Sequence, residues 1–389
     1  MTLCFATEAR FVKSEGKYYS LGGFGKGLWE RYLEHFDELV VIARVSEDGN
    51  MIGEDAALAS SDRVRFIELP YYIGFNGYLK NKRKIRRLIS ASINKDFCYI
   101  CRLPGQIGGI VSGILRRKGI PYACEVVGNP WDVFARGSVS HPLRPLIRMM
   151  ATISLKYQVR RASACLYVTR KTLQRMYPAG ESSFSVGVSD VIVSDNDFAA
   201  SPKVMESKDS YTIVSIGSLD QMYKAPDVLL KAMMLLKQKG INTRLLWMGD
   251  GKYRPDMVRL AEKMNVDAFF TGNLPREKVH SELEDADMFV LVSRTEGLPR
   301  AVIEAMAHGL PCIGTRVGGI PELLEDTVLI DKDEPLQLAG KIEKMIKDHD
   351  FADRQAQRNL MTARYFKEER LKQLRAGFFE YIKKQHSVR

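Results

Sequence analysis

The chain has 389 residues, which is more than one ordinary hydrophobic core accommodates, so two domains are expected. Hydrophobic residues make up 45% and charged residues 27%, as is usual for a globular protein, and no apolar run approaches the roughly 18 residues that cross a bilayer. The formal net charge is +11, and residues 1–197 hold 28 lysines and arginines against 19 aspartates and glutamates, which indicates an anionic partner. The start, MTLCFATEAR, lacks the basic and apolar regions of a signal peptide, so a cytoplasmic location is expected.

Short β-rich runs alternate with helical stretches along the whole chain. This alternation predicts an α/β fold in which parallel sheets carry helices on both faces. The polar stretch 193–211 interrupts the pattern, so we expect Rossmann-like, doubly wound domains over 1–195 and 196–365 and a helical tail over 366–389 that packs back on the first domain. Two such domains face each other across a cleft at the carboxyl ends of their strands. The expected strands are 3–7, 39–45, 64–69, 97–102, 122–127 and 164–168, then 211–217, 243–248, 268–270, 288–292 and 312–314.

A glycine-rich loop is expected directly after the first strand. The segment YSLGGFGKGLWERYLEHF (19–36) leads into a helix, and its glycines, such as Gly23, let the backbone approach a ligand while the helix N-terminus favours an anion. The loop matches neither a Walker A motif, because Gly27 follows Lys26, nor GxGxxG, because Leu28 occupies the last glycine position. A plain flexible connection is therefore the alternative interpretation.

The densest cluster of positive charge is LKNKRKIRRLIS (79–90). Leu79, Ile85, Leu88 and Ile89 can share one helix face, and six lysines and arginines surround the rest of the helix. Such a pattern is typical of a helix that lies on anionic lipid, here at the inner face of the plasma membrane. A solvated helix of a cytosolic protein explains it equally well. Nucleic acid is not expected as a partner, because no zinc-finger spacing or base-stacking motif accompanies the charge.

The six cysteines lie mostly in strand-like runs. Cys98 and Cys101 form a CxxC, but residues i and i+3 of a strand point to opposite faces, and no second CxxC or histidine pair accompanies them. Core packing is therefore the expected role of the cysteines.

Two glycine turns follow strands in the second half. In VSIGSLDQMYKAPDVLLKAM (214–233), Lys224 stands at the start of the expected helix, where a cation is unfavourable unless a phosphate is present. In LLWMGDGKY (245–253), the strand ends in a tight loop that begins at Gly249. Several glycine turns at one sheet edge indicate a ligand site more strongly than a single turn does.

The segment SRTEGLPRAVIEAMAHGLPCIG holds two glutamates in otherwise small and apolar surroundings. Pro299 suits the first turn of a helix, so the amides of Gly297 and Leu298 are free to bind phosphate. Glu304 lies five residues further, or about 7.5 Å along the helix axis, where its carboxylate can accept the two hydroxyls of a ribose. Glu296 precedes the helix and can meet a sugar. The alternative is structural, with Glu296 as a helix cap and Glu304 in an interior salt bridge.

These residues resemble a known family. E-GLPRAVI-E is similar to the E-x7-E motif of the retaining GT-B glycosyltransferases, and of glycosyltransferase family 4 (group 1 type) in particular. EAMAHGLPCIGTRVGGIPELL and the order of IGSLDQMYK, WMGDG and FFTGNLPREKV extend the resemblance over about 211–326. It implies a GT-B hexosyltransferase that moves a sugar from a nucleotide-sugar, with a UDP-sugar expected first and a GDP-sugar as the alternative. The implied acceptor is lipid-linked or a polysaccharide of the cell surface, and no cofactor or metal is implied.

The resemblance also implies roles for single residues. Glu304 would bind the donor ribose, and Glu296 the hydroxyls of the transferred sugar. Lys224 would neutralise the departing diphosphate, so that Glu296 and Lys224 are the implied catalytic pair. The other implied donor contacts are Gly297, Leu298, Gly249, Leu274 and Gly23.

The sequence departs from the family at two places. Ser218 stands where an arginine is usual, and Arg300, or Lys26 from the facing loop, is the candidate replacement for the missing cation. Many relatives also carry a histidine after the fifth strand, whereas this chain reads EVVGNPWD (125–132). The acceptor-side candidates are Asn129, Trp131, Asp132 and Lys26.

Two rival functions follow from these departures. A GT-B nucleotide-sugar epimerase would use the same donor site without an acceptor. A non-catalytic protein that binds membrane surfaces would carry a vestigial nucleotide cleft, which Ser218 favours and the intact glutamate pair opposes.

Overall fold

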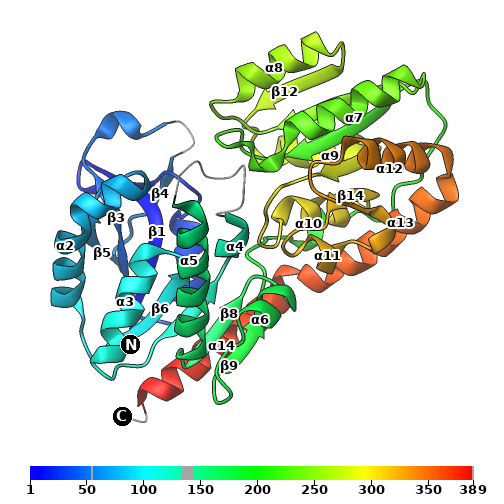
Figure 1. The fold of residues 1–389 in the computed structure, drawn as a ribbon. Helices are drawn as coiled ribbons and strands as arrows, with labels where there is room; N and C mark the ends of the chain where they lie inside the picture. The colour runs from blue at the N-terminus through cyan, green and yellow to red at the C-terminus, as the bar shows by residue number, and fades with distance from the viewer. Residues whose placement is uncertain (54–55, 134–142, 388–389) are drawn as a thin grey trace. The chain divides into compact units, whose positions relative to one another are not determined.

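The computed structural model describes residues 1–53, 56–133 and 143–387 (Figure 1). The chain forms two compact units. The first unit comprises Met1–Pro130, Met149–Val188 and Lys372–Arg389, and the second comprises Trp131–Arg148 and Ser189–Leu371. In the described residues no helix is both long and apolar enough to cross a membrane.

The first unit is built on a nine-stranded sheet in the order β4-β2-β1-β6-β7-β8-β9, with β3 beside β1 and β5 beside β3. All pairs are parallel except those that β2 makes with β1 and β4. The strands are β1 (Thr2–Ser14), β2 (Lys17–Ser20), β3 (Glu38–Ser46), β4 (Ala57–Leu58), β5 (Val64–Pro70), β6 (Cys98–Leu103), β7 (Ala123–Val126), β8 (Ala164–Tyr167) and β9 (Phe184–Gly187).

The start of this unit differs from the expectation. The first strand continues to Ser14 and returns as the antiparallel strand β2, so the glycine-rich loop follows a hairpin and not the first parallel strand. The hairpin was missed because Lys13, Ser14, Glu15 and Gly16 interrupt the apolar pattern that marks a buried strand. The next helices in the chain are α1 (Lys26–Leu33), α2 (Gly74–Ser92), α3 (Gln106–Arg117), α4 (Pro130–Val133), α5 (Arg144–Arg160) and α6 (Thr172–Met176). Most of α4 and the first residues of α5 are assigned to the second unit, and the others to the first.

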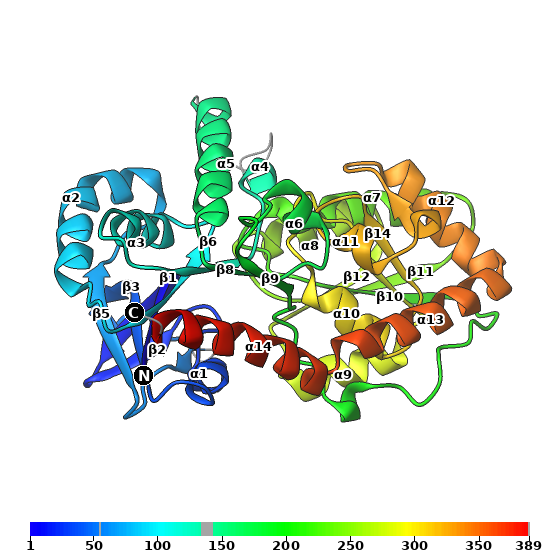
Figure 2. The same ribbon diagram turned by 90° about the horizontal axis from the view of Figure 1, so that it is seen from below.

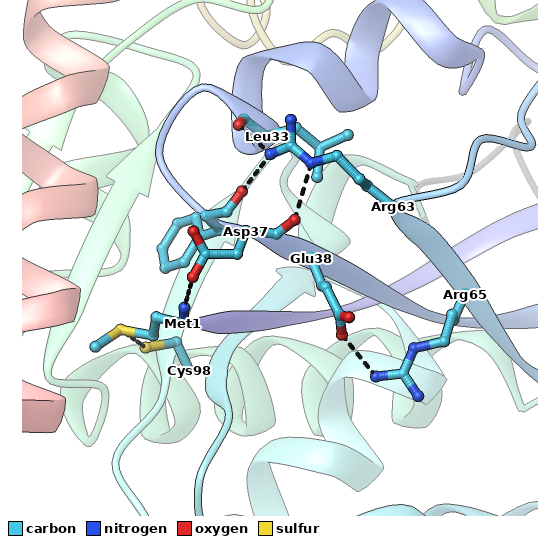
Figure 3. Close-up of polar contacts among 8 residues, drawn as sticks. Met1, Leu33, Asp37, Glu38, Arg63, Arg65 and Cys98 are labelled. Atoms are coloured by element: carbon cyan, nitrogen blue, oxygen red, sulfur yellow. Dashed lines mark hydrogen bonds and ion pairs between the residues drawn. The ribbon is translucent and has the colours of Figure 1, made fainter.

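Arg63, just before β5, ties α1 to β3 (Figure 3). Its guanidinium donates to the carbonyl oxygens of Leu33 at 2.6 Å and Asp37 at 2.9 Å. Carbonyls at a helix end lack intrahelical partners, so these bonds satisfy them. At the other end of the chain, Phe379 of α14 (Glu368–Ser387) packs its ring against Tyr32 of α1, with the ring centroids 5.5 Å apart.

Helix α2 does not present the apolar face expected for a helix on lipid. Ile85 and Ile89 are fully buried, and the helix packs against β5 and α3, so its apolar side belongs to the core of the first unit. Leu79 is exposed on another side of the helix. The interpretation of 79–90 as an inserting helix is therefore wrong, because tertiary packing covers most of its apolar residues. The lysines and arginines of α2 remain exposed.

The six cysteines are free and buried, as expected for core residues. Burial raises the pKa of the Cys98 thiol to about 11, so this thiol is protonated at neutral pH.

The second unit is a six-stranded parallel sheet in the order β12-β11-β10-β13-β14-β15, which is the doubly wound order of a Rossmann fold. The strand order reverses between β10 and β13, and ligands bind at such a switch point. The strands are β10 (Tyr211–Ile216), β11 (Thr243–Met248), β12 (Asp267–Gly272), β13 (Met288–Leu291), β14 (Cys312–Thr315) and β15 (Leu329–Ile330). The helices are α7 (Pro226–Gln238), α8 (Arg254–Lys263), α9 (Arg276–Asp285), α10 (Arg300–Ala307), α11 (Ile320–Leu323), α12 (Pro335–Lys347), α13 (His349–Ala363) and the start of α14.

Candidate functional site

A cavity of about 900 Å³ opens at the switch point of the second unit. Its walls come from the loops that follow β10, β11, β12 and β13 and from the first turns of α10. The lining residues are Ile216, Gly217, Ser218, Asp220, Tyr223, Lys224, Met248, Gly249, Asp250, Gly251, Asn273, Glu296, Leu298, Pro299, Arg300, Ala301 and Glu304.

The glycine turns of this edge are needed because the loops approach one another closely. Gly249 has φ +136°, and a Cβ atom on it would lie 2.3 Å from the carbonyl oxygen of Gly217. At Gly251, with φ +151°, a Cβ would lie 2.2 Å from the amide nitrogen of Asp220. No other residue fits either position without displacing backbone. These glycines therefore shape the cavity by letting the loop after β11 pack closely against the loop after β10.

Lys224 and Glu296, the implied catalytic pair, contact each other directly. The Lys224 Nζ lies 2.6 Å from Glu296 Oε1, and the two side chains are only 11% and 9% exposed. The Ser293 hydroxyl donates to the same carboxylate oxygen at 2.6 Å. Two charges buried this deeply are tolerated only when they are paired and hydrogen-bonded. The pair thus places a cation and an anion side by side on the cavity wall.

Arg294, which was not among the expected site residues, holds the loop that carries Lys224. Its backbone N–H donates to the Tyr223 carbonyl oxygen at 2.6 Å, and its Nη1 donates to the Met222 carbonyl oxygen at 2.6 Å. The same guanidinium binds both carboxylate oxygens of Asp227 in α7, at 3.1 and 2.9 Å. Arg294 stands two residues before Glu296, so one short segment supplies the carboxylate and fixes its lysine partner.

Glu304 lies on α10 between the large cavity and a smaller one of about 250 Å³. Burial raises the pKa of the Glu304 carboxyl group, and the positive charge of Arg300 opposes this rise. The two cavities share Ile216, Arg300 and Glu304 as lining residues. The other residues that line the smaller cavity are Ile192, Val193, Asp197, Arg276, Val279, His280 and His308.

His308, which the sequence analysis also missed, lies one helical turn after Glu304. It is buried, and its Nε2 has no hydrogen-bond partner among the described residues. Its ring centroid lies 5.0 Å from that of His280, and burial followed by this neighbouring histidine lowers the pKa of His308, so the ring is neutral at pH 7. The spacing of four residues on one helix is the sequence signal that would have placed it beside Glu304.

Arg300 supplies positive charge where Ser218 does not. It lines both cavities, and within the described chain its guanidinium makes no ion pair and no side-chain hydrogen bond. Ser218 lines the large cavity and accepts a hydrogen bond from the Asp220 amide at 3.2 Å. The structure thus brings Arg300 to the wall where the family's missing cation was expected.

Two other implied donor contacts do not line the cavity. The Gly297 carbonyl oxygen accepts a hydrogen bond from the Gly319 amide at 2.6 Å, whereas its neighbour Leu298 does line the cavity. Leu274 is half-buried outside the wall, and Asn273, one residue earlier, occupies the wall instead. The cavity wall of these two loops is thus formed by Leu298 and Asn273, and the donor roles of Gly297 and Leu274 stay predictions.

The remaining candidates lie outside this cavity wall. Gly23 has φ +77° in the loop before α1, and Lys26 begins that helix, both in the first unit. Asn129 is buried in the first unit and accepts a hydrogen bond from the Tyr177 hydroxyl. Trp131 is exposed, and the Arg148 guanidinium lies 3.8 Å from its ring centroid. Asp132, beside it, is half-buried.

The residues of this site lie in a segment that is similar to known proteins. Residues 197–360 match the family model of the glycosyl transferases group 1. Over 350 residues the chain is 28% identical to Protein CapJ of Staphylococcus aureus, covering 89% of this chain and 86% of CapJ. Over 121 residues it is 35% identical to the putative colanic acid biosynthesis glycosyltransferase WcaL of Escherichia coli strain K12, covering 29% of this chain and 30% of WcaL.

A solved structure supports the fold. The crystal structure of Anabaena Alr3699/HepE in complex with UDP and glucose resembles this chain with a TM-score of 0.64 at 15% identity, covering 98% of this chain and 99% of that one. This likeness extends over both units, whereas the family model covers only the second.

Proposed function

Because the chain is a group 1 glycosyltransferase with the GT-B fold, we propose that it is a retaining enzyme that transfers a sugar from a UDP-sugar to a cell-surface glycan or its lipid-linked precursor. The observation that carries the proposal is the convergence of Lys224, Glu296 and Glu304 on one cavity of about 900 Å³. Ligand cavities of roughly 300 to 1,000 Å³ suit small organic molecules of nucleotide-sugar size.

The charges along the cavity wall favour a donor that carries hydroxyls at both ends and a diphosphate between them. The Glu304 carboxylate accepts the ribose hydroxyls, which needs its ionised form. Arg300, four residues earlier on the same helix, is placed to bind the diphosphate. Lys224 and Glu296 touch each other, so a sugar joined to a phosphate is the group that would contact both at once.

In the proposed reaction, Lys224 stabilises the leaving group. The bond between the sugar C1 and the diphosphate oxygen breaks, and the positive charge at Lys224 Nζ balances the negative charge that develops on that oxygen. The new bond from the acceptor oxygen to C1 forms on the same face, and the acceptor proton passes to the departing phosphate oxygen. Glu296 accepts hydrogen bonds from the sugar hydroxyls and so fixes C1 beside Lys224. The attack of the acceptor on the same face of C1 that the diphosphate leaves is inferred from the family resemblance.

The choice of donor and acceptor rests on the relatives. HepE is described in complex with UDP and glucose, which favours UDP over GDP. WcaL is described as a colanic acid biosynthesis glycosyltransferase, which favours a surface polysaccharide as product. The exposed lysines and arginines of α2 suit an acceptor that is anionic or attached to anionic lipid. A cytoplasmic location and a reaction without metal or other cofactor are part of the proposal.

Calorimetric titration with UDP, GDP and ADP, in the presence of EDTA, tests the donor site. We expect UDP to bind with a micromolar dissociation constant and Glu304→Ala to abolish its binding. Normal binding by that variant, or binding that depends on added metal, contradicts the assignment. NMR of the product's anomeric signal then tests retention, and an inverted product overturns it.

Incubation with the UDP-sugar alone separates transfer from the rival activities. A retaining transferase returns the donor unchanged apart from slow hydrolysis. An epimerised nucleotide-sugar supports the epimerase instead. Failure of all three nucleotides to bind supports the non-catalytic surface protein.

A further inference from the structure

His308 is a buried side chain that has one polar atom without a partner. It directly follows α10, it is 7% exposed, and its Nε2 has no hydrogen-bond partner among the residues that the structure describes. Buried polar groups are almost always hydrogen-bonded, because an unpaired one lowers the stability of the fold. The proposed reaction does not use His308. Its Nε2 therefore needs a partner that is not a side chain of the described protein.

His308 shares the smaller cavity, of about 250 Å³, with Glu304 and Arg300. Helices α9 and α10, drawn in yellow in Figure 2, supply most of its walls. The His308 amide donates to the Glu304 carbonyl oxygen at 3.1 Å, so the two residues are one helical turn apart and their side chains lie on the same side of α10. Arg300 lies one turn before Glu304. One stripe of α10 thus brings a guanidinium, a carboxylate and an imidazole to one cavity.

The polar groups that α9 brings to this cavity are already paired. Arg276 donates its Nε to His280 Nε2 at 3.2 Å, and His280 Nδ1 lies 3.3 Å from Asp197 Oδ1. Since Nε2 of His280 accepts, the ring proton is on Nδ1, where it faces the carboxylate. Arg276 also pairs with Asp197 at 2.6 Å. None of these three side chains can turn to the stripe on α10 without breaking its own bonds.

The stripe on α10, in contrast, has hydrogen-bonding capacity left. Within the part of the chain that the structure describes, the side chains of Arg300 and Glu304 make no hydrogen bond and no ion pair, and Nε2 of His308 is likewise unpartnered. A buried water makes about three hydrogen bonds to such groups, and it needs far less room than this cavity offers. The smaller cavity therefore suits water that is held by all three side chains.

We propose that His308 is a positioning residue for the ribose-binding carboxylate: its Nε2 donates to water in the smaller cavity, and this water donates to Glu304. The inference rests on the proposed role of Glu304 in the donor site. A donor at this place favours the ionised carboxylate, which the ribose hydroxyls need, and fixes its orientation. The neutral ring of His308 suits this task, because an imidazolium would pair with the carboxylate and compete with the ribose for it.

Other charges also act on these two side chains. The charged and titratable groups that face Glu304 and His308 are Asp197, Arg276, His280, Glu284 and Arg300. They are the same in the unchanged chain and in variants of His308. A difference in titration between such variants therefore reports the side chain of His308 alone.

The test replaces His308 by phenylalanine, which keeps a ring but has no nitrogen, and by glutamine, whose amide can donate as Nε2 does. Calorimetry in EDTA measures the affinity for UDP as a function of pH. In His308→Phe the carboxylate loses a donor, so the midpoint below which UDP affinity falls should rise by about one pH unit. Between the two midpoints the affinity falls by up to about tenfold, and at high pH it stays within about threefold of normal. His308→Gln should restore the original profile.

Val302→Ala is the matched control for disturbed packing. Val302 lies on the same helix, is fully buried and lines neither of the two cavities. Its truncation should change UDP affinity equally at every pH. A uniform loss of this kind in His308→Phe would show a structural role and overturn the proposal. Equal midpoint shifts in the phenylalanine and glutamine variants would overturn it as well, because charge on the ring would then be the cause.

A second measurement is independent of the donor. The titration of Glu304 without nucleotide is followed by ¹³C NMR of the full chain with labelled glutamate carboxyl groups, and Glu304→Gln identifies the signal. We expect the same rise of about one pH unit in His308→Phe. An unchanged midpoint refutes the role of His308 whatever UDP does. If UDP fails to bind the unchanged chain but the NMR midpoint shifts, the donor proposal is wrong and the link between His308 and Glu304 stands.

Discussion

The glycine-rich loops of the two units look alike in sequence and differ in their surroundings. In the second unit, a Cβ atom on Gly249 or Gly251 would lie within 2.3 Å of backbone atoms of a neighbouring loop. In the first unit, the same atom on Gly22 or Gly23 would meet nothing within 4 Å. Glycine therefore allows close packing of strand ends in one unit and an open loop in the other.

The charged side chains of the two units also differ in their exposure to solvent. At the cavity of the second unit, Lys224 and Glu296 are buried as an ion pair. On helix α2 of the first unit the charged side chains are exposed. Substitutions at the cavity should thus have large effects, and matching substitutions in the first-unit loop should have small ones.

The largest effect is expected for Gly249→Ala. The new methyl group would clash with the Gly217 carbonyl, and the backbone at φ +136° is strained for any other residue. We expect a loss of about 3 kcal/mol or more in the free energy of unfolding and no UDP binding. Denaturant unfolding and calorimetry measure the two quantities, and a stable variant that binds UDP would contradict the close packing of the two loops.

The second largest effect is expected for Glu296→Gln, which should lower the turnover number. It keeps the shape of the side chain but removes the charge that pairs with Lys224, so that the lysine and sugar are no longer held in place. We expect kcat to fall by roughly 10²- to 10³-fold, as for removal of one transition-state contact. UDP, which lacks the sugar, should bind within about threefold of normal. A large loss of UDP affinity with unchanged kcat would place Glu296 at the diphosphate instead.

Arg300→Ala and Lys26→Ala compare the two candidates for the missing cation. A charge-assisted hydrogen bond contributes about 1.5 to 3 kcal/mol, so Arg300→Ala should weaken UDP binding by roughly 10- to 100-fold. Lys26→Ala should change it by less than about threefold. The reverse order of effects in calorimetry would assign the diphosphate to the first-unit loop.

The pH dependence of UDP binding tests Glu304. Burial raises the pKa of this carboxyl group, and ribose binding needs the ionised form. UDP affinity should therefore be constant at high pH and fall as the pH is lowered, beginning above the pH at which an ordinary glutamate is protonated. Below the pKa the loss approaches tenfold per pH unit. In Glu304→Gln the affinity should be low and independent of pH over this range, and a profile like that of the unchanged chain would assign the titration to another group.

The smallest effect is expected for Gly22→Ala in the open loop. Nothing lies within 4 Å of the added methyl group, so the free energy of unfolding should change by no more than about 0.5 kcal/mol. UDP affinity should also be unchanged. A loss comparable to that of Gly249→Ala would remove the contrast between the two loops.

The alternation of strands and helices was sufficient to predict two doubly wound domains, because apolar periodicity depends on nearby residues alone. It failed at the β1–β2 hairpin, where polar residues interrupt the pattern. At the site, the motif around Glu296 and Glu304 predicted which residues line the cavity, since one loop and one helix carry them. Of the expected donor contacts, Gly297 and Leu274 do not line the cavity, because the side that a loop residue faces depends on the contacts of that loop.

The sequence by itself predicted the fold class, the resemblance to the GT-B glycosyltransferases and the two glutamates of the cavity wall, because these depend on local spacing. Only the tertiary structure decided that Lys224 meets Glu296 and that Arg294 holds their loop. It also decided that the Nε2 of the buried His308 has no hydrogen-bond partner among the residues that the structure describes. It further decided that Ile85 and Ile89 of α2 are covered while Met150 and Ile153 of α5 are exposed. An amphipathic pattern predicts that a helix has an apolar side, but which elements pack against that side depends on chain segments far away in the sequence.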